Sequence, residues 1–178
     1  MTITLVPYAG LCNRMNVIMS ALAYQQNHPE TEVSIKWHRW FHCNCRFKDL
    51  FKPIALITPS VSELSEFNWR DTPGHRLNLF LPDKLRKCFF DVVFMPHNSP
   101  DEFEEMVDAF RKNTGKEPNV YVYKENCFCR DLWTSNYAYI FQPQEYIQRR
   151  IDEITKDWKG HVVGLHVRRT DNVRAIQN

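Results

Sequence analysis

The sequence contains almost no excess of charge of either sign, and it contains no long hydrophobic run. Its 178 residues include 23 Lys and Arg against 21 Asp and Glu, a formal net charge of only +2. This balance argues against binding to nucleic acid or anionic lipid through bulk electrostatic attraction. No stretch is apolar for long enough to span a bilayer, and the first residues have neither the cationic head nor the apolar core of a signal peptide. We therefore expect a cytoplasmic protein with no transmembrane segment and no nucleic-acid partner.

Internal repeats and low-complexity tracts are also absent, whereas the material for one hydrophobic core is present. Hydrophobic residues make up 43% of the chain and aromatic residues 13%, which suffices for a compact domain of ordinary size. The six cysteines are expected to be free thiols, because such a core does not need disulfides and the cytoplasm keeps thiols reduced.

Two Cys-x-Cys pairs raise the question of a metal site. The first pair, Cys43 and Cys45, lies close to His38 and His42, and the second pair is at residues 127 and 129. Structural zinc sites more often use Cys-x2-Cys, because two intervening residues let both thiolates reach one tetrahedral ion. Two cysteines one residue apart on an extended chain are as readily explained by packing. We favour packed thiols and no metal. A zinc-binding interaction domain built on His38, His42, Cys43 and Cys45 remains an alternative.

The first third of the chain has the pattern of a strand, a tight loop, a helix and a second strand. Residues 2–6 form an apolar run that ends at a turn over residues 7–10, and apolar residues at helical spacing follow from Met15 to Leu22. Alternating apolar residues then occupy positions 32–37. This is the size of a βαβ unit, which predicts a parallel sheet covered by helices. Residues 38–88, broken by several prolines, are expected to form loops with short elements, an insertion of the kind that often carries binding residues.

The alternation of strand and helix resumes after residue 88. A buried strand is expected at residues 89–95, and Ser99, Pro100 and Glu102 are typical of a helix start. Asn113 to Gly115 should end that helix. The remaining expected elements are a strand at 120–123, a helix from Pro143 to Gly160 and a strand at 161–167. The fold class predicted is α/β, with a Rossmann-like parallel sheet and flanking helices.

The polar residues that follow the last expected strand are the strongest candidates for a site. The segment is His166-Val-Arg-Arg-Thr-Asp171, and ligands of open α/β sheets bind beyond the carboxyl ends of the strands. Of the adjacent guanidinium groups of Arg168 and Arg169, one can grip phosphate oxygens while the other pairs with Asp171. A solvated strand end with a surface ion pair is the alternative, and His166 can equally be an ordinary strand residue.

This segment resembles the donor-binding motif His-x-Arg-Arg-x-Asp of the α-1,6-fucosyltransferases and the bacterial nodulation fucosyltransferases. Thr170 before the aspartate is similar to the α-1,6 type. A second likeness is Gly10-Leu-Cys-Asn-Arg-Met15, which resembles the Gly-Leu-Gly-Asn-Gln/Arg loop near the amino terminus of such transferases.

The resemblance implies the amino-terminal portion of a GT-B glycosyltransferase that transfers fucose from GDP-fucose to a glycan or related acceptor, with inversion and without a metal or other cofactor. Residues 1–142 would be the acceptor-side Rossmann-like domain, 143–160 a connecting helix, and 161–178 the first strand and loop of a truncated donor-binding domain. Arg168 and Asp171 would be catalytic, with Arg168 on the donor phosphates. The donor site would include His166, Arg168, Arg169, Gly10 and Asn13.

The chain also departs from the resembled pattern. Cys12 stands where the family loop has glycine, and Asn172 and Ile176 stand where the α-1,6 enzymes have a lysine and a glutamate proposed as general base, so no base is assigned. We expect the 178 residues to be a fragment with little activity alone, and to self-associate through the unpaired last strand. A non-catalytic nucleotide- or phosphate-binding α/β module remains an alternative function.

Overall fold

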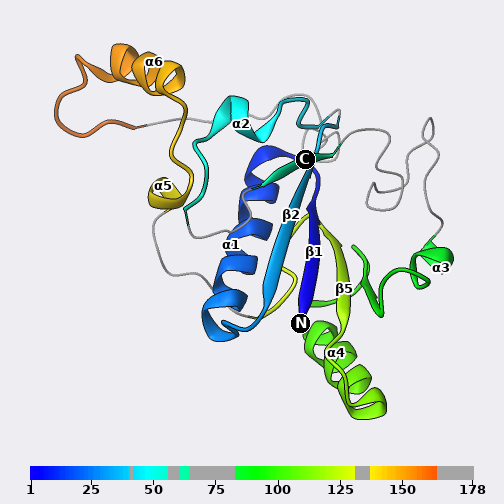
Figure 1. The fold of residues 1–178 in the computed structure, drawn as a ribbon. Coiled ribbons are helices and arrows are strands. Elements are labelled where there is room, and N and C mark those ends of the chain that lie inside the picture. The colour runs from blue at the N-terminus through cyan, green and yellow to red at the C-terminus, as the bar shows by residue number, and fades with distance from the viewer. Residues whose placement is uncertain (41, 56–60, 65–82, 131–136, 164–178) are drawn as a thin grey trace, which may run out of the picture. The chain divides into compact units, whose positions relative to one another are not determined.

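The computed structural model describes residues 1–40, 42–55, 61–64, 83–130 and 137–163 (Figure 1). The chain divides into two compact units, Met1–Gln144 and Glu145–Asn178. The first unit contains the sheet and both hydrophobic clusters among these residues. Each unit is described separately below.

The first unit is built on a five-stranded sheet in the order β3-β2-β1-β5-β4. Every strand pair is parallel. The strands are β1 (Thr2–Pro7), β2 (Glu32–His38), β3 (Ser62–Leu64), β4 (Val92–Phe94) and β5 (Asn119–Lys124). A parallel sheet needs crossover connections, which helices supply here. The predicted α/β, Rossmann-like class is confirmed.

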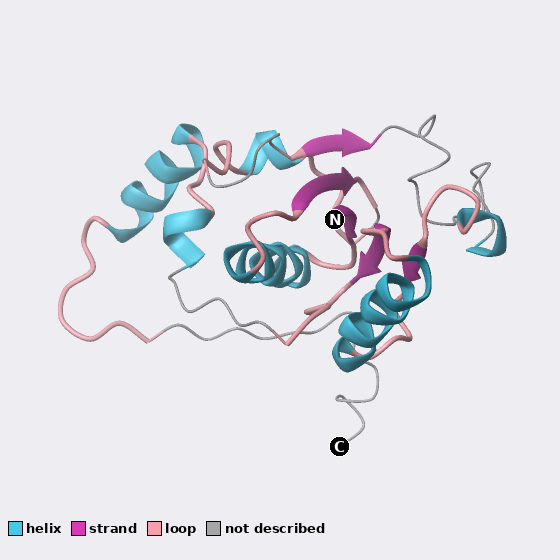
Figure 2. Cartoon of the chain, turned by 60° about the horizontal axis from the view of Figure 1, so that its bottom comes forward, coloured by secondary structure: helices cyan, strands magenta, loops and turns pink. Residues whose placement is uncertain are grey.

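Alternation along the strands sends side chains into two separate clusters. Ile3 and Leu5 of β1 belong to the larger cluster, together with residues of helices α1 (Leu11–Asn27) and α4 (Pro100–Thr114). Val6 belongs to the smaller cluster with Val93 and Tyr121. Figure 2 shows α1 and α4 on the same face of the sheet. The central strand is therefore apolar on both faces, as expected for a strand of a covered parallel sheet.

Helix α4 begins and ends where its sequence indicates. Ser99 is the N-cap of a capping box, with Pro100 as the first helical residue. The Glu102 carboxylate accepts a hydrogen bond from the Ser99 backbone N–H at 3.3 Å and one from Asn98 Nδ2 at 2.7 Å. Gly115 closes the helix at φ 68°, a left-handed conformation that costs glycine little. The predicted start and stop signals are both confirmed.

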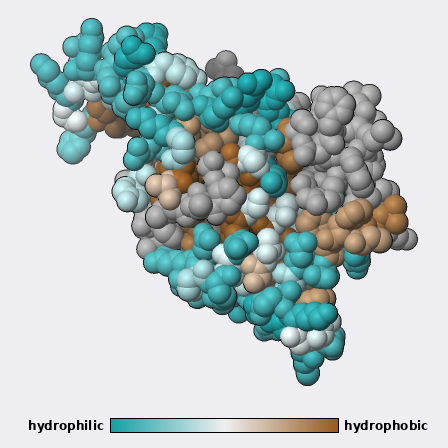
Figure 3. Space-filling model, viewed as in Figure 1, coloured by the Kyte–Doolittle hydropathy of each residue, from teal (hydrophilic) through white to brown (hydrophobic). Residues whose placement is uncertain are grey.

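The insertion expected over residues 38–88 contains only short elements in its described parts. These are α2 (Phe47–Leu50), β3 and α3 (Asp83–Arg86). The strand expected at 89–95 is shorter, because only Val92–Phe94 pair with β5. Leu85 and Phe89 are 52% and 44% exposed, and apolar surface gathers in this part of Figure 3.

The last two helices belong to different units. Helix α5 (Tyr137–Ile140) closes the first unit. Helix α6 (Glu145–Thr155) ends before Gly160, so the expected end was wrong by about a turn. Beyond Thr155 the chain turns, with the Trp158 N–H donating to the Thr155 carbonyl at 2.9 Å. Residues 161–163, the described part of the last expected strand, are in no strand, and residues 164–178 lie outside the described residues.

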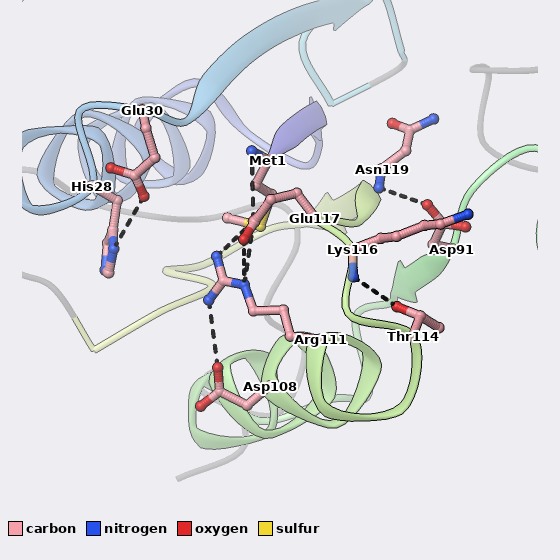
Figure 4. Close-up of polar contacts among 10 residues, drawn as sticks. All are labelled: Met1, His28, Glu30, Asp91, Asp108, Arg111, Thr114, Lys116, Glu117 and Asn119. Atoms are coloured by element: carbon pink, nitrogen blue, oxygen red, sulfur yellow. Dashed lines mark hydrogen bonds and ion pairs between the residues drawn. The ribbon is translucent and has the colours of Figure 1, made fainter.

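The amino edge of the sheet carries ion pairs (Figure 4). Arg111 Nη2 donates to Glu117 Oε2 at 2.8 Å, and Arg111 Nη1 lies 3.4 Å from Asp108 Oδ1. The contact with Glu117 ties the end of α4 to the segment that leads into β5. In the part of the chain that the structure describes, no helix has the length and apolar content to cross a membrane.

Candidate functional site

The carboxyl edge of the sheet, where β1 lies between β2 and β5, has the topology of a ligand site. From β1 the chain passes through α1 to β2 on one side, while β5 adjoins β1 on the other side. Ligands of open α/β sheets bind outside the carboxyl ends of the strands at such a reversal of strand order. The loop that leaves β1 at this point contains Gly10, the N-cap of α1.

The amino terminus of α1 is free of the side chains that usually occupy such a position. No side chain of the N-cap bonds the first turn, and the first turn contains no acidic residue. Uncapped backbone N–H groups and the positive end of the helix dipole favour an anion. Asn13 lies in this first turn, so Gly10 and Asn13 both lie at the amino terminus of α1. Their predicted role as donor-binding residues stays a prediction.

Nothing in the local backbone requires glycine at position 10. Its φ of −69° and ψ of 168° are extended values that any residue adopts. A Cβ added there would meet no atom closer than Asn13 Oδ1 at 4.0 Å. The absence of a side chain at Gly10 is therefore not explained by packing of this unit, and it leaves backbone open to close approach by a ligand. Cys12, the departure from the resembled loop, is exposed on α1.

Arg14 is the residue of this loop whose role the sequence did not reveal. Its side chain is fully buried. Its Nε donates to the Ala9 carbonyl at 2.9 Å, its Nη1 donates to the His38 carbonyl, and its guanidinium stacks 4.7 Å from the centroid of Trp37. Arg14 thus joins the ends of β1 and β2 and holds Ala9, which has φ 68°.

The charge of Arg14 is buried, and no carboxylate among the described residues is hydrogen-bonded to it. Burial lowers the pKa of Arg14, and nearby Cys43 and Cys45 oppose that shift. The Nη2 atom is buried and has no hydrogen-bond partner in the described structure. From the sequence, an arginine at this position of a helix would be expected on the surface. The structure shows that it is a buried clamp, a side chain that links the ends of β1 and β2.

At the carboxyl edge of the sheet, two tyrosines and a carboxylate lie close together. The rings of Tyr8 and Tyr123 lie 4.5 Å apart. Burial raises the pKa of Tyr8, and a hydrogen bond to Glu125 raises it further. The neighbouring Lys124 is buried and donates to the carbonyls of Pro96 and Asn98 at 3.2 and 2.7 Å. Lys124 therefore anchors a loop, and burial lowers its pKa.

The cysteine and histidine residues weighed as zinc ligands do not gather around one point. Cys43 Sγ and Cys45 Sγ lie 3.5 Å apart. His38 is buried at the end of β2, whereas His42 is exposed. Among the residues that the structure describes, no group of three or more His, Cys, Asp or Glu side chains could hold a metal ion. In the second pair, Cys129 Sγ lies 3.2 Å from Ser20 Oγ in the core, as packed thiols would.

The arginine motif is not part of the described structure. His166, Arg168, Arg169 and Asp171 all lie outside the described residues. The geometry of the site therefore rests on the loop from Tyr8 to Asn13 and its neighbours on β2 and β5.

No model of a known protein family matches this chain. No solved structure matches it either.

Proposed function

We propose that this chain is the amino-terminal part of a GT-B glycosyltransferase that transfers fucose from GDP-fucose to a glycan or related acceptor. Two features support the proposal together. One is the resemblance of residues 166–171 to a fucosyltransferase donor motif. The other is the loop of Gly10 and Asn13, which lies at the edge of a Rossmann-like sheet where ligands bind.

The chemistry that the residues would perform is charge stabilisation. Departure of GDP develops negative charge on the β-phosphate, and a fixed guanidinium binds that charge most strongly as it appears. In this proposal Arg168 binds the phosphates, Arg169 makes a second phosphate or structural contact, Asp171 orients the arginines and His166 lies beside the donor. The first turn of α1, which no side chain caps, adds the positive end of a helix dipole near the substrate.

Within the described structure, the observation that carries the proposal is the glycine at position 10. Its backbone conformation and its surroundings would accept alanine without strain or collision. Glycine there is explained if a substrate approaches the backbone of the loop. Glycine is also a better N-cap than alanine, so the donor-binding effect of Gly10→Ala has to be read beside its effect on stability.

The proposal is tested by calorimetric titration of the full-length protein, since the resemblance implies a second domain that holds the guanine. GDP-fucose, GDP-mannose and UDP-galactose are compared, and release of GDP is followed with acceptor glycans. We expect GDP-fucose to bind most tightly. Arg168→Ala should weaken binding by about 2 to 5 kcal/mol, as removal of a buried charged partner does.

Two further variants sharpen this test. Gly10→Ala should lower the free energy of unfolding by no more than about 1 kcal/mol, because alanine is a poorer N-cap than glycine. It should weaken donor binding by about tenfold, or roughly 1.4 kcal/mol. The control is Arg149→Ala, which removes an exposed arginine of α6. Equal affinity of wild type and Arg168→Ala would contradict the phosphate role. Donor binding without transfer to any acceptor would favour the non-catalytic module.

A further inference from the structure

Two thiols face each other at the carboxyl end of β2. Cys43 Sγ and Cys45 Sγ are 3.5 Å apart, close enough for one thiol to donate to the other. Cys43 is buried and Cys45 is partly exposed. Alpha carbons two positions apart are at most about 7 Å from each other, which lies at the upper end of the separation that a disulfide spans.

The segment that carries this pair is held in place from both sides. The backbone N–H and carbonyl of Cys43 are both bonded to Trp40, at 2.9 and 3.2 Å. The indole Nε1 of the buried Trp37 donates to the Cys45 carbonyl at 2.8 Å. These hydrogen bonds hold the two sulfur atoms close together, so the pair does not depend on loop motion to come into contact.

A buried cation lies next to the pair. Ionised Cys43 and Cys45 oppose the effect of burial on the pKa of Arg14, as Tyr123 and Glu63 do, so the sulfurs and the guanidinium interact electrostatically. Arg14 Nη2 is buried without a hydrogen-bond partner in the described structure. A guanidinium in this position stabilises a thiolate, which is the reactive form of cysteine.

We propose that Cys43 and Cys45 form a redox-active dithiol that closes to an internal disulfide by exchange with a small disulfide. The partly exposed Cys45 thiolate attacks one sulfur of the external disulfide, and the first small thiolate leaves and takes up a proton. Cys43, as thiolate, then attacks the Cys45 sulfur of the mixed disulfide and expels the second small thiolate. Two protein thiols are oxidised, and one external disulfide is reduced to two thiols.

The surroundings set the speed of the first step. Burial, the hydrogen bond with Cys43 and the charges of Cys43 and Asp49 raise the pKa of Cys45 to about 11, and Arg14 opposes that shift. At neutral pH little thiolate is present, so the pair stays reduced against mild oxidants. Closing a ring with one residue between the cysteines is strained, and strained disulfides are the ones that reducing thiols reopen.

The second Cys-x-Cys pair provides a matched control within the chain. It has the same spacing, but Cys129 Sγ lies 3.2 Å from Ser20 Oγ and 3.7 Å from the Ser20 carbonyl. Cys129 is buried in the core. Contact with Ser20 gives that sulfur a different partner, so we expect no disulfide between residues 127 and 129.

The test uses the chain with the two exposed cysteines removed, as Cys12→Ser and Cys88→Ser. The folded protein is treated with 4,4′-dithiodipyridine, and intact mass and peptide mapping are recorded. We expect the Cys43 to Cys45 disulfide, seen as a loss of about 2 Da with two thiopyridones released. The rate of disulfide formation should rise about tenfold per pH unit between pH 7 and 9, because the thiolate fraction of Cys45 rises by that factor.

Single variants separate the two steps. Cys43→Ser should stop at a stable mixed disulfide on Cys45, and Cys45→Ser should give neither product at this pair. A mixed disulfide on Cys45 that persists when Cys43 is present would overturn the proposal. Equal oxidation of residues 127 and 129 would overturn it as well, because spacing alone would then explain the reaction.

Discussion

At the scale of single residues, the decisive interactions involve side chains whose environment is set by distant parts of the chain. Arg14 is an example, because its two carbonyl partners belong to residues 9 and 38. Gly10 and Asn13 were predicted as site residues from the resemblance of their loop to that of a transferase family, and that prediction stays a prediction. The sequence did not predict the clamp, because burial of an arginine depends on tertiary packing and leaves no mark in local spacing.

Replacement of Arg14 by methionine should destabilise the fold. Methionine keeps apolar contact with Trp37 but leaves the carbonyls of Ala9 and His38 without their donor, at a cost of about 2 kcal/mol after relief of the buried charge. Chemical denaturation measures the change. The control Arg39→Met removes an exposed arginine next to β2, and a cost equal to that of Arg14→Met would show that the clamp contributes nothing.

Tyr8 should remain protonated at a pH where ordinary tyrosines ionise. Its pKa is raised by burial, by the hydrogen bond to Glu125 and by the charge of that carboxylate. Because the folded pKa lies above the unfolded value of about 10, the stability linked to Tyr8 is complete below that pH and is lost as the pH rises further. The absorbance of tyrosinate, compared between wild type and Tyr8→Phe, isolates this group. A difference curve centred near pH 10 would show that the shift is absent.

At the scale of elements, the sequence predicted best where local signals and tertiary packing agree. For α4 the cap, the apolar stripe and the terminal glycine all indicate one helix, and the structure has it at Pro100–Thr114. β1 and β5 are bounded as expected because apolar runs end at turns. The strand around β4 is shorter than predicted because pairing with β5, which the sequence does not encode locally, decides its length.

The start of α4 can be tested directly. Ser99→Ala removes the hydroxyl of the capping box and should lower the free energy of unfolding by about 1 kcal/mol. Thermal or chemical denaturation measures it. Lys112→Ala, in the exposed last turn of the same helix, is the control and should change stability by less than about 0.5 kcal/mol. A neutral Ser99→Ala would mean that Pro100 and Glu102 alone fix the helix start.

At the scale of the whole molecule, the described core belongs to the first unit. All five strands and both hydrophobic clusters lie within Met1–Gln144. Helix α6 of the second unit contains no buried residue, and Ile151, Ile154 and Trp158 are exposed. A helix of this length is marginal in water without a packing partner.

Residues 1–144 should therefore fold when expressed alone. We expect a cooperative unfolding transition within a few degrees of that of the 178-residue chain, because the removed segment adds no buried side chain of α6 to the core. Circular dichroism during heating measures both. A broad transition, or one lowered by more than about 10 °C, would show that residues 145–178 stabilise the sheet.

In the part of the chain that the structure describes, the two outermost strands of the sheet, β3 and β4, are three residues long each. Short edge strands offer a neighbouring molecule few free peptide groups for intermolecular strand pairing. In concentrated solution these edge strands should make poor templates for amyloid-like growth, even though the central strands are long and rich in valine and isoleucine.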